Sequence, residues 1–117
     1  MPVVRVDGGQ LITWESFHDV FAAAFGFPSF YGRNMDAWID CMTSLDAPDD
    51  GLTAIHGSAA DPVVLHLDHA SSMPGEIFDA LNECSAFVNW RRIVVGEPAI
   101  LVLSYWRTEP GARPDNA

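Results

Sequence analysis

The spacing of apolar residues predicts three helices. Phe, Val and Ala recur at three- and four-residue intervals from Phe17 to Phe25, and Thr13 or Ser16 can cap the start of this first helix. Gly26 ends it, and Pro28 prevents its continuation.

Asn34 is a good cap for a second helix, and a third helix is expected from about Pro74, since the first turn tolerates a missing N–H. Each of these helices has apolar positions at helical spacing, and we expect those of the third helix to face inward. The apolar positions are Met35, Trp38, Ile39 and Met42 in the second helix, and Ile77, Phe78, Leu81, Cys84, Phe87 and Val88 in the third.

Three short runs predict strands: "PVVRV" at 2–6, "PVVLHL" at 62–67 and "PAILVLSYW" at 98–106. The second and third runs lack polar alternation, which is typical of strands covered on both faces. The order strand, two helices, strand, helix, strand requires crossover connections. The sequence therefore predicts an α/β fold, a small three-stranded parallel sheet with helices packed on it.

At 117 residues the chain is expected to form one domain. We place this domain at residues 1–107. Residues 46–61 show little periodicity and are expected to be a long loop or mobile insertion. The polar stretch at 108–117 is expected to be a flexible C-terminal tail.

The chain is strongly acidic, with sixteen Asp and Glu against six Arg, no Lys and a net charge of −10. This charge repels nucleic acid and anionic membrane, so neither is expected as a partner. It would speed the capture of a basic protein, although it also serves solubility alone. The start of the chain lacks an apolar signal core, so a cytoplasmic location is expected. In that reducing compartment Cys41 and Cys84 would be buried thiols.

Asp36 and Asp40 lie four residues apart on the second helix, so they share one face about one turn apart. The helix dipole favours Asp36 in the first turn, whereas Asp40 lies mid-helix, where Asp is a poor helix former. Taken alone, the pair is explained most simply as a solvated face. Its expected apolar neighbours are instead typical of a binding face: Phe30, Tyr31, Ile39 and Leu45.

Catalytic and metal-binding interpretations are weaker. Paired carboxylates in hydrolases face each other across a cleft, whereas neighbours on one short helix point the same way. His66, Asp68 and His69 suggest a metal, but their spacing along a strand end does not guarantee converging ligands. Cys41 lies on an apolar side with no His or cation beside it. We therefore expect no enzyme activity, no catalytic residue, no cofactor and no metal.

The stretch "PSFYGRNMDAWIDC" at 28–41 combines a tight Tyr31–Gly32 turn, a cap, two acids and a thiol in fixed order. It resembles the barstar family, intracellular inhibitors of the ribonuclease barnase. The resemblance runs without a gap from about Val3 to Leu45, and beyond it only the pattern of strands and helix is shared. It implies that the second helix and the loop before it block the active site of a basic ribonuclease.

By this resemblance Asp40 matches the family's central acid, which takes the place of an RNA phosphate. Asp36 matches a second acid, and Glu83 is the best match for a third. Carboxylates accept the same bidentate Arg pairing as phosphates, so such an array satisfies the cations of a ribonuclease cleft. The partner-binding residues implied are Phe30, Tyr31, Gly32, Asn34, Asp36, Ile39, Asp40, Thr43, Leu45 and Glu83.

The chain departs from the family's pattern around the two acids. The family's first turn aromatic, a Tyr, is Phe30 here, the outward Trp between the acids is Ile39, and a Trp after the helix is Leu45. Arg33 replaces an acid and would add a positive charge beside the face. The insertion begins at the expected rim, with Asp46.

These features favour an inhibitor or immunity protein for a basic ribonuclease or nuclease toxin that differs from barnase. We expect the free protein to be a monomer. The alternative is a barstar-fold binding module for a different cationic protein that is not a nuclease.

Overall fold

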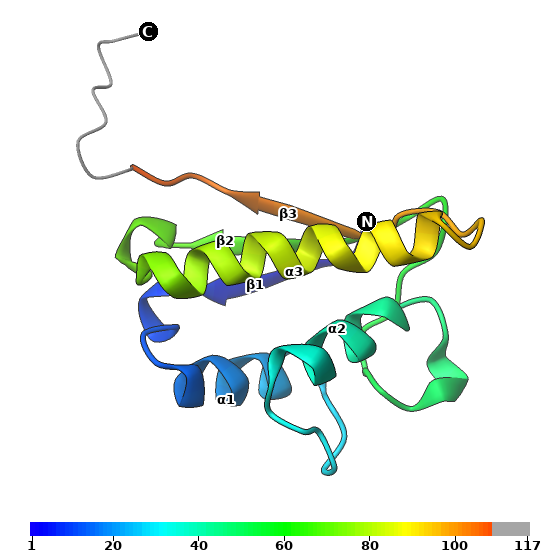
Figure 1. Cartoon of the computed structure of the whole chain (residues 1–117), viewed down its shortest axis with the longest axis horizontal. Coiled ribbons are helices and arrows are strands. Elements are labelled where there is room, and N and C mark those ends of the chain that lie inside the picture. Colours follow the sequence, from blue (N-terminus) through cyan, green and yellow to red (C-terminus); the bar gives the residue numbers. More distant parts are fainter. Residues whose placement is uncertain (109–117) are drawn as a thin grey trace, which may run out of the picture.

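The computed structural model describes residues 1–108 and shows a three-stranded parallel sheet with the order β1-β2-β3 (Figure 1). The strands are β1 (Val3–Asp7), β2 (Val63–Asp68) and β3 (Leu101–Tyr105). The helices are α1 (Trp14–Phe25), α2 (Met35–Thr43) and α3 (Gly75–Ile93). The predicted α/β fold is confirmed. The tail expected at 108–117 lies, apart from Thr108, outside the described residues.

Local signals place the helix ends where the sequence predicts them. Thr13 and Ser16 cap α1 reciprocally, and Gly26 ends it in the left-handed conformation, with a φ of 67°. The Asn34 side chain accepts the N–H of Ala37 at 2.8 Å and so caps α2.

Helices cover only one face of the sheet. Val63, Leu65 and Leu67 of β2 are buried, whereas the residues between them are partly exposed. Val3 and Val102, which pair with Val64 on the other face, are 56% and 42% exposed. The expectation that β2 and β3 are covered on both faces is therefore wrong. Side chains of β2 alternate between the core and the open face. The sequence does not reveal this alternation, because valine suits a half-exposed pleated surface and occupies both kinds of position.

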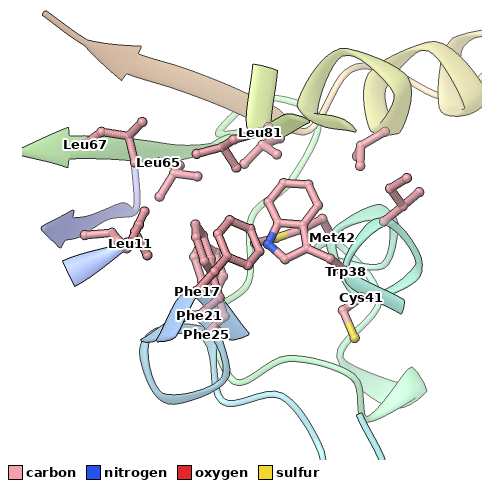
Figure 2. Close-up of a cluster of buried hydrophobic side chains, with 14 of the residues drawn as sticks. Leu11, Phe17, Phe21, Phe25, Trp38, Cys41, Met42, Leu65, Leu67 and Leu81 are labelled. Atoms are coloured by element: carbon pink, nitrogen blue, oxygen red, sulfur yellow. The ribbon is translucent and has the colours of Figure 1, made fainter. Parts of the chain in front are cut away.

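Trp38 of α2 is fully buried and joins the helices in one core. Figure 2 shows its indole between the phenylalanines of α1 and Leu81 of α3. The Phe21 and Trp38 rings meet edge to face, with centroids 5.7 Å apart. Phe87, predicted to face inward, is instead 44% exposed, because it lies on the outer side of α3 while Leu81 and Val88 face the core.

The 46–61 insertion is anchored to the end of α1. The N–H of Ala54 donates to the Phe25 carbonyl at 2.8 Å, and the N–H of Gly57 donates to the Leu45 carbonyl at 2.9 Å. A Cβ placed on Gly26 would lie 2.6 Å from the Ala54 methyl, so this approach requires glycine. The segment contains one 3₁₀ turn at Pro48–Asp50, and its backbone hydrogen bonds hold it against the end of the helix.

Arg92 of α3 joins four parts of the chain from a side chain that is only 2% exposed. It donates two parallel hydrogen bonds to the Asp46 carboxylate, each 2.8 Å long. Two further donations reach the carbonyls of Thr43 at 2.9 Å and Pro98 at 2.8 Å. These hydrogen bonds from Arg92 hold the pKa of Asp46 below its usual value. Asp46 is thus held by the fold and is not a free charge at the rim.

We expect Arg92→Met to lower the free energy of unfolding by about 3 kcal/mol, because it removes one partner of a largely buried ion pair and orphans two carbonyls. Urea unfolding followed by circular dichroism measures this loss. Arg5→Met is the matched control, since Arg5 pairs with Asp68 at the exposed surface and its removal should barely move the unfolding midpoint. Equal midpoints for the two variants would contradict the structural role of Arg92.

Candidate partner-binding site

Three acids lie on neighbouring parts of α2 and α3. Asp36 and Asp40 are exposed on α2, and Glu83 is exposed on α3. Burial raises the pKa of the Cys84 thiol, and the charges of Glu83 and Asp36 raise it further, so both acids lie near that residue. Figure 1 shows α2 running alongside the second half of α3 in the same direction. The structure therefore brings the sequence-predicted acids together and turns them outward.

Asp40 already has a cationic partner within the chain. Arg91 Nη1 donates to Asp40 Oδ1 at 3.0 Å, and the two side chains are 38% and 65% exposed. An ion pair this exposed adds little stability and is readily exchanged for another cation. Sequence reasoning missed Arg91, because only the packing of α3 beside α2 brings residue 91 next to residue 40.

Arg33 does not add its charge to the acidic face as expected. Its guanidinium forms an ion pair with Asp19 at 2.8 Å and donates to the Glu15 carbonyl at 3.2 Å. Both partners belong to α1. The positive charge of Arg33 is therefore directed towards α1.

The expectation that Tyr31, Ile39 and Leu45 flank the acids on the outside is wrong. Tyr31 and Ile39 are each 9% exposed, and Leu45 is fully buried. Ile39 and Leu45 belong to the same buried core as Trp38. Of the aromatic pair before the helix, only Phe30, at 76% exposure, lies on the surface.

The remaining predicted residues have structural partners or lie open. The side chain of Asn34 caps α2, and the Thr43 hydroxyl donates to the Ile39 carbonyl at 2.6 Å. Gly32 is exposed in the turn before the helix. The exposed part of the candidate site therefore consists of Phe30, Gly32, Asn34, Asp36, Asp40 and Glu83.

A buried contact between Tyr31 and His18 holds the loop before α2 in place. The Tyr31 hydroxyl lies 2.6 Å from Nδ1 of the buried His18. Burial lowers the pKa of His18, and the positive charge of Arg33 lowers it further, while Asp19 raises it. Burial also raises the pKa of Tyr31 well above its usual value. At neutral pH the imidazole is therefore neutral, and in the tautomer protonated at Nε2 its Nδ1 accepts a hydrogen bond from the tyrosine.

A hollow of about 240 Å³ opens between this loop and α2. Asp40 contributes the charged side chain to its wall, and Leu52 of the insertion closes one side. Its lining residues are Pro28, Phe30, Tyr31, Gly32, Ala37, Asp40, Cys41 and Leu52. Burial raises the pKa of Cys41 to about 11, with a smaller effect from the Asp40 charge, so this thiol is protonated and poorly nucleophilic.

The His66, Asp68 and His69 side chains have partners of their own. His69 Nδ1 lies 2.9 Å from Asp7 Oδ1, and Asp68 Oδ1 accepts from Arg5 at 2.7 Å. Within residues 1–108 no group of three His, Cys, Asp or Glu side chains could hold a metal ion. The helices of this same range include none that is long and apolar enough to cross a membrane.

Comparison with known proteins gives the family of the chain. The family model described as "Barstar (barnase inhibitor)" matches residues 1–95. This chain belongs to the barstar family. A relative from Bacillus subtilis (strain 168), named "Putative ribonuclease inhibitor YrdF", is 39% identical over 49 residues. That match covers 41% of this chain and 54% of the relative, so the chain spans about half the length of this relative.

We expect the stability of the protein to fall as the pH decreases below about 6.5, the pKa of histidine in an unfolded chain. Because the folded pKa of His18 is lowered, the unfolded state binds more protons between the two pKa values. Stability is therefore full above this window and is lost on acidification through it. Urea midpoints at pH 7.5 and 5.5 measure the effect.

His18→Gln keeps an acceptor for the Tyr31 hydroxyl and should flatten this pH dependence. His56→Gln, at an exposed position, should leave it unchanged. A pH dependence equal to wild type in His18→Gln would show that His18 does not cause it.

Proposed function

We propose that this chain is an intracellular inhibitor of a basic ribonuclease and blocks its active site with α2 and the loop before it. The observation that carries this proposal is the array of outward acids, Asp36, Asp40 and Glu83, on two packed helices. The family match and the name of the Bacillus relative support the class of partner.

Ribonucleases stabilise a phosphoryl transition state with cationic side chains. Carboxylates accept the same charge-assisted and bidentate hydrogen bonds as phosphate oxygens, so acids in the right array satisfy that cleft. The array is preorganised here, because the Asn34 cap, the buried Trp38 and the Arg92 contact each fix one part of α2. Little order has to be gained on binding, which favours affinity.

The ion pair with Arg91 sets a condition on the partner. Arg91 occupies Asp40 Oδ1, and within residues 1–108 Oδ2 of Asp40 accepts no hydrogen bond. A cation of the ribonuclease either shares the carboxylate through Oδ2 or displaces Arg91. Either route would cost little free energy, because the ion pair is exposed to water.

The hollow beside Asp40 has the size to receive one side chain of the partner. Once a side chain fills it, its largely apolar lining would exclude water and so strengthen a charge contact with Asp40. This apolar hollow with one carboxylate fits a side chain that has an apolar stem and, at its tip, a positive charge or a hydrogen-bond donor. The exposed ring of Phe30 lies at the same hollow and adds apolar contact.

The net charge of −10 would draw a basic enzyme towards this surface and speed its association. The barnase–barstar complex is itself one of the cases on which that rule is based. We propose that the protein acts as a cytoplasmic monomer that neutralises its ribonuclease or nuclease toxin by binding, without catalysis. The different surroundings of the acids point to a cognate enzyme other than barnase.

Titration of the purified chain into RNA cleavage assays tests the proposal, with barnase and a panel of small basic microbial ribonucleases as probes. We expect stoichiometric inhibition of at least one of these enzymes. Asp40→Ala should weaken that inhibition by about 2 kcal/mol or more, chiefly through faster dissociation, because it removes the central anion. Kd from inhibition and the rate constants from surface plasmon resonance give the measurement.

Asp49→Ala is the matched control, since it removes one exposed carboxylate from the insertion. It should slow association modestly and leave dissociation unchanged. Undiminished inhibition by Asp40→Ala would mean that the site is wrongly assigned. A chain that inhibits none of the ribonucleases, but binds another cationic protein, would favour the barstar-fold binding module.

We expect Arg91→Gln to accelerate association with the inhibited ribonuclease several-fold at low salt, because it removes a positive charge that repels a basic partner and frees Asp40. The gain should shrink as the ionic strength rises. Arg5→Gln makes the same charge change on the open face of the sheet and should have a smaller effect. A slower association for Arg91→Gln would show that Arg91 itself contacts the partner.

A further inference from the structure

We propose that the exposed aromatic pair Phe87 and Trp90 on α3 forms the second half of the partner-binding surface, packing against the ribonuclease beside the cleft that receives Asp40. This inference rests on the proposed function and names a further part of the same interface. It gives a contact role to Phe87, which the sequence pattern assigned to the core, and to Trp90 beside it.

The two rings form an exposed apolar patch. Phe87 is 44% exposed and Trp90 57% exposed, and their ring centroids lie 5.5 Å apart. Val94, one turn beyond Trp90, is also 57% exposed. Residues spaced by three and four lie on one side of a helix, so the patch is continuous along α3. Aromatic side chains in such a patch are typical of a binding surface.

The patch adjoins the acids. Glu83 lies one turn before Phe87 on α3, and Arg91 lies one turn after it. Arg91 in turn reaches Asp40 of α2 at 3.0 Å. Phe87 is therefore set between Glu83 and the Arg91–Asp40 pair, and a protein that covers these charges also reaches the aromatic rings.

Phe87 and Trp90 provide apolar surface beside the acids, which α2 itself lacks. The sequence predicted Ile39 and Leu45 as apolar neighbours of the acids, but both side chains face the core. Phe30 remains on the loop side of Asp40, with 76% exposure. Phe87 and Trp90 supply the apolar contact on the α3 side, which would exclude water from the charge contacts between them.

The charge around the patch decides which occupant fits. A second copy of this chain would bring two acidic surfaces together, each on a protein of net charge −10. An anionic membrane is repelled for the same reason. A cationic protein is complementary to the acids, and its Arg side chains can stack on the faces of Trp and Phe while pairing with nearby carboxylates.

Binding of the double variant Phe87→Ala/Trp90→Ala tests this inference, with the ribonuclease of the panel that the wild-type chain inhibits most strongly as the probe. We expect Kd to rise at least tenfold, chiefly through faster dissociation. The loss should depend little on salt, in contrast to the loss in Asp40→Ala. Both rings are largely outside the core, and circular dichroism and urea unfolding confirm that the variant folds.

Trp106→Ala is the matched control, because Trp106 is 77% exposed and lies near the hollow at the carboxyl end of β2, away from Arg91. It should bind as wild type. Trp90→Phe, which keeps a ring, should recover most of the affinity lost in Trp90→Ala.

The outcomes separate the two proposals. If the double variant binds as wild type while Asp40→Ala is impaired, this inference fails and the proposed function stands. If neither change weakens binding, the assigned site is wrong and this inference fails with it. If the wild-type chain inhibits no ribonuclease, the proposed function fails, and this occupant fails too. If light scattering finds a wild-type dimer that the double variant abolishes, a second copy covers the patch and the inference is overturned.

Discussion

The contact between Arg92 and Asp46 sets the geometry on which the candidate surface depends. One buried guanidinium holds the carboxyl end of α2, the first residue of the insertion and the segment before β3. The acids come from both α2 and α3, so their spacing depends on how these helices are held together. A buried ion pair is a weak guarantee of stability, but its two parallel hydrogen bonds allow few arrangements, and this selectivity fixes the geometry of the candidate surface.

The same surface shows a conflict between folding and binding. Asp36 and Asp40 repel each other across one helical turn, and Glu83 adds a third negative charge nearby. Arg91 offsets part of this repulsion in the free protein through an exposed and easily exchanged pair with Asp40. A basic partner would offset the rest. Asp40, which the helix dipole does not favour, is thus best explained by the cation that we propose it binds.

Specificity would arise around the acids rather than from them. By the resemblance to the barstar family, Asp36 and Asp40 match two acids of its pattern. The apolar residues expected next to them, Ile39 and Leu45, face the core, and the exposed rings lie on α3. The insertion adds Leu52 to the wall of the hollow. A partner complementary to this surface would place its apolar residues differently from a partner of another family member, even if both inhibitors present the same central carboxylate.

The sequence by itself determined the elements whose signals are local. Thr13, Gly26 and Asn34 act on backbone groups within a few residues, so the helix ends were predictable, and the order of elements implied a parallel sheet. Tertiary structure alone decided the pairing of Arg91 with Asp40 and of Arg92 with Asp46, which join residues 51 and 46 positions apart. It also decided which apolar residues face outward. The sequence pattern around Phe87 and Tyr31 is the same whether these side chains are buried or exposed. Burial depends on what packs against a side chain, and those contacts come from distant parts of the chain.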